Sequence, residues 1–320
     1  MTNKKRDHFP YIFSKAGQKM KAVLKSAVKS IIPHDTLNEM RNVLFTYNVK
    51  SIEQQYKQAE HQPEFLGLSE LDTLFNQHPF PPEYGYGLET LLNRGNYRAK
   101  TLLKLDEAQK GKRFLELGCW DGMVSRALHK RGKEAVAQDI RSSGFDQRAI
   151  EAGVQFHEMD AGNLTFDDEQ FDFVFTFDAF EHFQHPDRVM KEVNRVLKKG
   201  GGFYFQFGPL YYSAFGWHAY RSIPIPYLQV LFPSDLLDSY IEENNLKPIN
   251  YQHVNGWSLD RFRSLWGEYT KSSLTVKQYQ EYKYIGHVNM IKKYPSCFKK
   301  ENLNFDNFIV SHLQGYFIKN

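Results

Sequence analysis

The feature that most constrains the fold is an apolar segment that runs directly into a turn containing two glycines. Residues 113–122 have the sequence RFLELGCWDG, and a helix-like stretch from Met123 to Lys130 follows them. Glycines let the backbone turn tightly and approach a ligand closely, while the next helix presents unpaired N–H groups and the positive end of its dipole. The segment therefore predicts a strand, a ligand-binding turn and a helix in succession.

The alternation of strands and helices continues along the chain. We expect further strands at 134–139, 154–160, 171–177 and 203–207, and a helix from about Pro186 to Lys199. Strands that are buried on both faces are mostly apolar, as the segment 171–177 is. The second strand ends in Asp139, about twenty residues after the glycine turn, where a βαβ unit needs an acceptor for a ribose hydroxyl. The pattern predicts a doubly wound, mostly parallel α/β sheet.

Five segments of this region, in their order and spacing, resemble the class I S-adenosylmethionine-dependent methyltransferases. They are LELGCWDG at 115–122, Asp139, MDAGNL at 159–164, FDFV at 171–174 with Glu181 and His182, and LKKGG at 197–201. The chain most resembles the small-molecule group that includes the quinone-biosynthesis methyltransferases, and the resemblance covers roughly residues 110–210. It implies a Rossmann-like sheet of seven strands and S-adenosyl-L-methionine as the cofactor. Trp120 departs from the family, since it replaces the middle glycine of a Gly-x-Gly-x-Gly turn.

The resemblance also implies which residues bind the cofactor. The methionine part would be surrounded by Glu116, Gly118, Trp120 and Gly122, the ribose hydroxyls would contact Asp139, the adenine would contact Asp160 and Ala161, and the site would be closed by Phe177 and Asp178. Methyl transfer from a sulfonium is an in-line displacement with an activated leaving group. The enzyme therefore chiefly aligns the reactants and removes a proton where the nucleophile carries one.

Asp178, Glu181 and His182 form a second candidate constellation, which would share one face if residues 178–185 begin a helix. Three roles are open: structural support with cofactor contact, a general base, or a divalent metal site with His218 as fourth ligand, for which Mg²⁺ or Mn²⁺ would suit the oxygen-rich set. The spacing resembles a box that holds metal in some methyltransferases, although related chains carry the Glu-His pair without metal. We take His182, His218 and Asp178 as the catalytic candidates and expect no metal.

The chain divides by composition into four predicted segments. These are a helical extension at 1–77, a linker with a leading helix at 78–109, the cofactor-binding core at 110–210, and a C-terminal part at 211–320. Four residues, Tyr84, Tyr86, Tyr97 and Arg98, either line the cofactor entrance or pack or cap the helix before the first strand. In the last segment, the aromatic residues after the fifth strand form either a lid over the substrate or an ordinary small core. We also expect a helix starting at Ser234. Closing strands are expected at 249–254 and 308–318, with a helical insertion at 257–300 between them.

The N-terminus carries a basic amphipathic pattern. From Phe13 to Ile31 apolar residues recur at helical spacing, with lysines on the other side. This helix either attaches to an anionic membrane surface or packs its apolar stripe on the catalytic domain. A transit peptide is a third interpretation, which the excess of lysine over arginine disfavours.

Composition agrees with a cytoplasmic enzyme. The net charge of +4 is too mild to indicate nucleic acid, the two cysteines do not suggest a disulfide framework, and no apolar run is long enough to span a bilayer. We expect O-methylation of a small or lipid-linked molecule. The alternatives are a metal-assisted RNA ribose methyltransferase, favoured by the basic N-terminus, and a cofactor-binding scaffold without catalysis, favoured by Trp120.

Overall fold

The computed structural model describes residues 49–82 and 87–320, which belong to two compact units. Of these residues, the smaller unit contains 49–64 and 285–302, and the larger contains 65–82, 87–284 and 303–320. The four segments expected from composition stay a prediction. The predicted basic helix from Phe13 to Ile31 lies outside the described residues. Within the described ranges, no helix is both long enough and apolar enough to cross a membrane.

The smaller unit is helical. Residues 49–58 form a helix, and two short helices follow much later in the chain, α12 (Asn289–Lys293) and α13 (Pro295–Lys299). The Lys299 ammonium donates a hydrogen bond to the Lys57 carbonyl at 3.0 Å and lies 5.3 Å from the centre of the Tyr56 ring. These contacts join chain segments that are far apart in sequence, so the unit is a tertiary structure in its own right.

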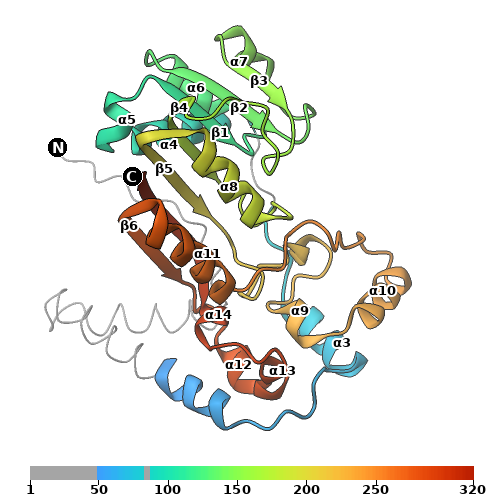
Figure 1. Cartoon of the computed structure of the whole chain (residues 1–320). Coiled ribbons are helices and arrows are strands. Elements are labelled where there is room, and N and C mark those ends of the chain that lie inside the picture. Colours follow the sequence, from blue (N-terminus) through green and yellow to red (C-terminus); the bar gives the residue numbers. More distant parts are fainter. Residues whose placement is uncertain (1–48, 83–86) are drawn as a thin grey trace, which may run out of the picture. The chain divides into compact units, whose positions relative to one another are not determined.

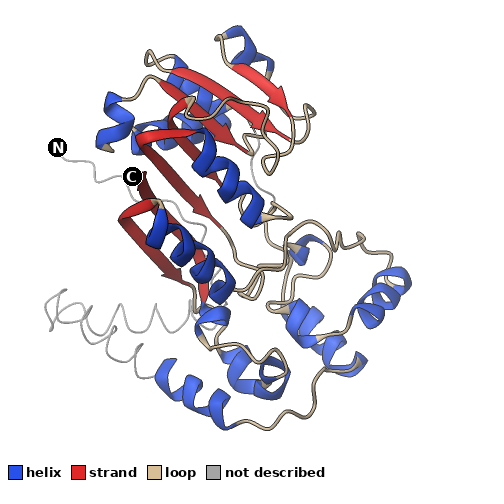
Figure 2. Ribbon diagram, viewed as in Figure 1, coloured by secondary structure: helices blue, strands red, loops and turns tan. Residues whose placement is uncertain are grey.

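The larger unit is built on one sheet of seven strands in the order β3-β2-β1-β4-β5-β7-β6 (Figures 1 and 2). The strands are β1 (Arg113–Leu117), β2 (Glu134–Asp139), β3 (Gln155–Glu158), β4 (Phe171–Phe177), β5 (Leu197–Phe207), β6 (Leu274–Lys283) and β7 (Val310–Lys319). The first five pair in parallel, whereas β7 is antiparallel to both β5 and β6. The predicted doubly wound, mostly parallel sheet is therefore confirmed.

Helices cover both faces of this sheet because successive strand residues point to opposite sides. On β5, Phe203, Phe205 and Phe207 belong to one core cluster, whereas Tyr204 belongs to another. The first cluster lies under α8 (Pro186–Val196) and α11 (Leu259–Ser272), and the second lies under α4 (Leu88–Leu102), α5 (Asp106–Lys110) and α6 (Met123–His129). The remaining helices of the unit are α3 (Leu68–Gln77), α7 (Gln147–Glu151), η1 (Ala219–Arg221), α9 (Leu228–Leu231), α10 (Ser234–Glu243) and α14 (Asp306–Ile309).

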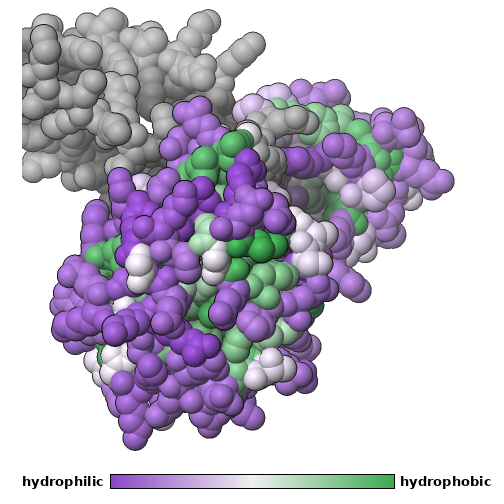
Figure 3. Space-filling view, turned by 90° about the horizontal axis from the view of Figure 1, so that it is seen from above, coloured by the Kyte–Doolittle hydropathy of each residue, from purple (hydrophilic) through white to green (hydrophobic). Residues whose placement is uncertain are grey.

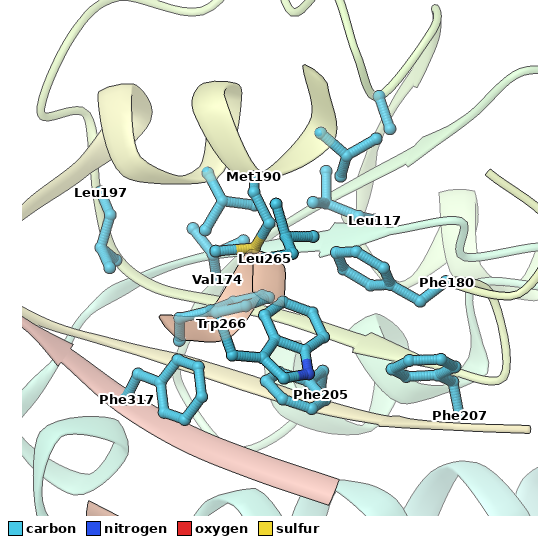
Figure 4. Close-up of a cluster of buried hydrophobic side chains, with 14 of the residues drawn as sticks. Leu117, Val174, Phe180, Met190, Leu197, Phe205, Phe207, Leu265, Trp266 and Phe317 are labelled. Carbon is cyan, nitrogen blue, oxygen red and sulfur yellow. The ribbon is translucent and has the colours of Figure 1, made fainter. Parts of the chain in front are cut away.

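The first core cluster combines aliphatic side chains with aromatic rings that contact one another (Figure 4). Trp266 of α11 stacks on Phe205 near the carboxyl end of β5, with ring centres 4.5 Å apart and an angle of 18° between the planes. Phe180, from the loop after β4, meets the same indole edge to face at 5.5 Å. This packing fixes the loop after β4 against the sheet, and that loop carries several candidate site residues.

Two predicted elements at the C-terminal side differ from the structure. Residues 249–254 form no strand, since 249–250 are irregular and 251–254 form turns and bends. The strand that pairs with β7 on its other side is β6, inside the segment 257–300 that we expected to be helical. The expected strand at 308–318 is confirmed as β7, and the helix start at Ser234 is confirmed as α10. The strand β6 escaped prediction because it is an edge strand with mostly exposed side chains, so it lacks the apolar alternation of a half-buried strand.

Candidate active site

The candidate site lies at the carboxyl ends of the parallel strands. The strands β1 and β4 are neighbours, with β2 and β3 beyond β1 and β5 beyond β4, so the strand order reverses between them (Figure 1). Ligands of open α/β sheets bind at this point, outside the carboxyl ends. Residues 118–122 follow β1 and residues 178–185 follow β4, and both segments border it.

The turn after β1 has the backbone that the sequence predicted. Gly118 and Gly122 have φ angles of 63° and 68°, in the left-handed region that favours glycine. A Cβ atom at Gly118 would lie 2.6 Å from Cβ of Ala179, and one at Gly122 would lie 2.3 Å from the Phe145 ring. Both glycines are therefore required by close packing as well as by the turn.

Trp120, which stands in place of the family's middle glycine, is accommodated without breaking this turn. Its φ is 46° and its side chain is 41% exposed. The indole lies against Gly144, where a Cβ atom would come within 2.6 Å of Nε1, and the Arg94 guanidinium is 5.7 Å from the ring centre. Ile140, directly after β2, is also exposed, at 65%. Together they form exposed apolar surface at the carboxyl ends of β1 and β2, although the surface seen in Figure 3 is largely hydrophilic.

Asp139 ties the end of β2 to the glycine turn. Its Oδ2 accepts a hydrogen bond from the Trp120 backbone N–H at 2.9 Å, and its Oδ1 accepts one from the Arg141 N–H at 3.3 Å. An ionised carboxylate offers about four acceptor positions, so Asp139 retains capacity for ligand hydroxyls. The geometry is compatible with the predicted ribose contact.

Glu116 is the most buried acid of the predicted cofactor set, at 3% exposure. Its Oε2 accepts two hydrogen bonds from Ser125 of α6, from the backbone N–H at 3.0 Å and from the hydroxyl at 2.6 Å. Burial raises the pKa of Glu116 to about 7, against the opposing effect of the Ser125 hydroxyl bond. A cationic group of a ligand would stabilise the ionised form of such a buried carboxyl.

The other predicted cofactor residues border the same edge. The Asp160 carboxylate accepts a hydrogen bond from the Gly162 N–H at 2.8 Å, and Ala161 is buried. Phe177, the last residue of β4, is 6% exposed, and the guanidinium of Arg98 lies 4.7 Å from its ring centre. Arg98 also forms an ion pair with Asp178, so the residue belongs to the site border.

Residues 178–185 do not begin a helix, so the condition for a shared face is not met, and the helix starts at Pro186 as expected. Asp178 has a left-handed φ of 49°, residues 179–185 form turns and bends, and α8 begins only at Pro186, whose fixed φ suits a first helical position. The predicted shared helix face of Asp178, Glu181 and His182 therefore does not exist. Asp178 pairs with Arg98 instead.

Glu181 turns into the protein interior. Its Oε1 accepts the Gly208 N–H at 3.2 Å, and within the described part of the chain its buried Oε2 has no hydrogen-bond partner. Burial, with a smaller contribution from Asp178, raises the pKa of Glu181 well above its ordinary value. Glu181 is thus buried beneath the loop, with Oε1 4.0 Å from His182 Nε2, and it is not one of the three clustered groups that could hold a metal.

His182 and His218 do come together, and a third histidine that the sequence did not single out joins them. The ring centres of His182 and His218 are 5.1 Å apart, and His253 lies 4.5 Å from His182 and 5.5 Å from His218. His218 arrives on the aromatic segment after β5, which is largely buried around Trp217 and Tyr227 and so packs as a small core. His253 was hidden in the segment wrongly expected to be a strand.

The tautomer and charge of His182 follow from its contacts. Its Nδ1 lies 2.6 Å from the His253 carbonyl, and because a carbonyl only accepts, Nδ1 carries the proton and Nε2 carries a lone pair in the neutral ring. Burial lowers the pKa of His182. Burial also lowers the pKa of His218, to about 3, with further lowering from His182 and His253. The cluster thus presents neutral imidazoles at neutral pH.

The comparisons with known proteins concern the part of the chain that carries this site. Residues 115–205 match the family described as methyltransferase domain. The ubiquinone biosynthesis O-methyltransferase of Coxiella burnetii is 31% identical over 101 residues, which cover 30% of this chain and 43% of that protein. The phthiotriol/phenolphthiotriol dimycocerosates methyltransferase of Mycobacterium leprae is 37% identical over 98 residues, which cover 28% of this chain and 36% of that protein. The chain thus spans less than half the length of these relatives.

Among solved structures, an S-adenosylmethionine-dependent methyltransferase from Mesorhizobium loti aligns with 72% of this chain and 100% of its own. Its sequence identity is 19% and the TM-score is 0.44. The family assignment of residues 115–205 rests on the sequence matches.

Proposed function

We propose that this chain transfers the methyl group of S-adenosylmethionine to an oxygen of a small or lipid-linked molecule. The proposal starts from the finding that residues 115–205 form a class I S-adenosylmethionine-dependent methyltransferase domain. The observation that carries the proposal is the juxtaposition of the glycine turn with a neutral imidazole. A Cβ atom at Gly118 would contact Ala179. His182 lies on the same loop as Ala179, and its backbone N–H donates to the Ala179 carbonyl at 2.8 Å. A cofactor in the turn after β1 would thus have a proton acceptor close by.

The cofactor would be held by the residues at the ends of β1 to β4. Asp139 would accept the ribose hydroxyls, and Glu116, Gly118, Trp120 and Gly122 would surround the methionine part. Asp160 and Ala161 would line the adenine side, and Phe177 would close the site. The buried Glu116 supports this arrangement because a cationic ammonium would compensate the cost of ionising it.

We assign proton removal to His182. An acceptor hydroxyl must lose its proton as the methyl group arrives, and a positioned base accelerates such a step by about 10² to 10⁴. The His253 carbonyl fixes the His182 tautomer so that the Nε2 lone pair is available. Asp178 would close the site through its pair with Arg98, and His218, whose ring centre lies 5.1 Å from that of His182, would support the ring of His182.

The acceptor class is supported by the relatives. One is named for O-methylation in ubiquinone biosynthesis, and another for methylation of phthiotriol or phenolphthiotriol dimycocerosates. Both names favour hydroxyl-bearing molecules of the lipid-linked kind for this chain as well. An anionic membrane surface would be a fitting partner for such an acceptor, since residues 4–29 carry eight lysines and arginines.

The test is transfer of a radiolabelled methyl group from S-adenosylmethionine by the full chain to a panel of acceptors. The panel contains a soluble catechol, a long-chain phenol in detergent and a short RNA with a free terminal ribose. Label in the phenolic acceptors supports the proposal. Label in the RNA alone would instead support a ribose methyltransferase, and cofactor binding without transfer to any acceptor would support a scaffold. Failure to bind S-adenosylmethionine would reject all three.

The role of His182 is tested in the same assay with His182→Gln. Turnover should fall about 10² to 10⁴ fold while calorimetric affinity for S-adenosylmethionine is retained. The matched control is His185→Gln, because His185 is exposed and stands just before α8. Equal activity of His182→Gln and wild type would remove His182 from the reaction.

A further inference from the structure

Three histidines from three separate loops converge beside the proposed reaction centre. His182 follows β4, His218 precedes η1 and His253 follows α10. Each offers one ring nitrogen, and these three nitrogens lie within 4.8 Å of one another. Imidazole rings gathered in this way are more than a packing motif, because each buried ring nitrogen needs a hydrogen-bond partner or a ligand.

Hydrogen bonds on the far side of the cluster orient two of the rings. His182 donates from Nδ1 to the His253 carbonyl. The ring of His218 forms a hydrogen bond with the backbone of Pro209. The remaining nitrogen of His218, Nε2, is buried and has no partner in the described part of the chain. Histidines that bind metals almost always donate their other ring N–H to a carbonyl or carboxylate, which fixes the tautomer and orients the lone pair.

We propose that His182, His218 and His253 form a binding site for a divalent transition metal ion such as Zn²⁺. Zinc bonds to imidazole nitrogen at about 2.0 to 2.1 Å, and tetrahedral geometry then places the nitrogens about 3.4 Å apart. The ring nitrogens, which lie within 4.8 Å of one another, must therefore close by at most about 1.4 Å, which side-chain rotation supplies. His253 is exposed and gives the ion access from solvent.

The ligand set decides the kind of metal. Mg²⁺ prefers oxygen ligands, whereas imidazoles suit zinc, copper, nickel and iron. Of the acids in the metal set predicted from sequence, Asp178 pairs with Arg98. Glu181 accepts the Gly208 N–H with Oε1, which lies 4.0 Å from His182 Nε2, but the cluster of mutually close ligand atoms contains only the three histidines. An all-imidazole site for a softer ion is therefore the one that the fold assembles.

Occupancy of this site would inhibit methyl transfer, a consequence that rests on the proposed function. The ion takes the lone pair on His182 Nε2 by forming a coordinate bond, and the same lone pair can then no longer accept the acceptor's proton. No electron or group is transferred, so the inhibition is reversed when the metal is removed. The site would make the enzyme responsive to the concentration of free transition metal.

The binding experiment uses the full chain after EDTA treatment and gel filtration, with metal alone and no cofactor or acceptor. Calorimetry with Zn²⁺ should show one equivalent bound, and Co²⁺ should give the visible absorption of a tetrahedral complex. His253→Ala should weaken Zn²⁺ binding at least tenfold, whereas the control His185→Ala should not. Because His253 is exposed, its variant should keep the wild-type melting temperature.

Either of two binding results would overturn the site: no saturable Zn²⁺ binding by the wild type, or equal binding by wild type and a folded His253→Ala protein.

Inhibition is then tested with the methyl-transfer assay. Zn²⁺ should lower turnover, with half-maximal inhibition at the Zn²⁺ concentration that half-saturates the site in calorimetry. EDTA should restore turnover. Loss of turnover in EDTA alone would reject inhibition by showing that the metal supports catalysis. The calorimetric assay is independent of methyl transfer, so its failure is distinct from failure of the proposed function.

Discussion

The buried carboxyl of Glu116 makes stability depend on pH in a direction opposite to that of ordinary surface acids. Its pKa is about 7 in the folded protein, against the ordinary glutamate value of 4.5 that applies to the unfolded chain. The folded state therefore holds this proton more tightly than the unfolded state does. The stabilisation is fully present below pH 4.5 and is lost as pH rises through 7.

The size of the effect follows from these two values. Between pH 5 and pH 8, linkage gives a loss of about 2.5 kcal/mol in the free energy of unfolding from this one group. Screening by solvent does not reduce the figure, because Glu116 is 3% exposed. In Glu116→Gln this contribution should vanish, since an amide does not titrate. The variant should thus gain about 2.5 kcal/mol relative to the wild type as pH rises from 5 to 8.

Urea unfolding at pH 5, 6, 7 and 8, followed by tryptophan fluorescence, measures this difference. All four tryptophans, at 120, 217, 257 and 266, lie in the larger unit, so the signal reports the unit that contains Glu116. The control is Glu134→Gln, because Glu134 is exposed at the start of β2. A difference between Glu116→Gln and wild type that stays constant with pH would refute the reasoning. Saturating S-adenosylmethionine should flatten the wild-type dependence, since an ammonium beside Glu116 favours its ionised form.

Three further predictions concern the cofactor, the core and the N-terminus. Asp139→Ala should weaken S-adenosylmethionine binding by about 2 kcal/mol or more, because charge-assisted hydrogen bonds are lost. Calorimetry measures this, with Asp167→Ala as a control because Asp167 is exposed. Unchanged affinity would remove Asp139 from the site. Trp266→Ala should cost about 3 to 5 kcal/mol in urea unfolding, because its ring stacks on Phe205 in the buried cluster; a loss under about 1 kcal/mol would contradict that packing. Deleting residues 1–32 should abolish sedimentation with anionic vesicles and spare turnover of a soluble acceptor; intact protein that ignores such vesicles at low salt would reject membrane attachment.

The local parts of this protein were predictable from sequence. The apolar runs of β1, β4 and β5 are buried on both faces, so hydrophobicity alone marked them as central strands. The two glycines at 118 and 122 marked the turn, because few other residues adopt its backbone. Asp139 could be placed because a strand ends where its apolar pattern ends. Each of these signals is carried by residues that are adjacent in the chain.

The arrangement of side chains around the candidate site was decided only by the tertiary structure. Arg98 pairs with Asp178 across 80 residues, and His182 donates to the carbonyl of His253 across 71. Neither distance leaves a periodic trace in the sequence. The left-handed backbone at Asp178 replaced a helix that its neighbours' spacing favoured, since packing of Phe180 on Trp266 holds the loop. Sequence determined the buried strands of the sheet, because burial requires their residues to be apolar, whereas the exposed edge strand β6 was not predicted. Tertiary packing determined which loops meet over it, because those contacts join segments that share no local pattern.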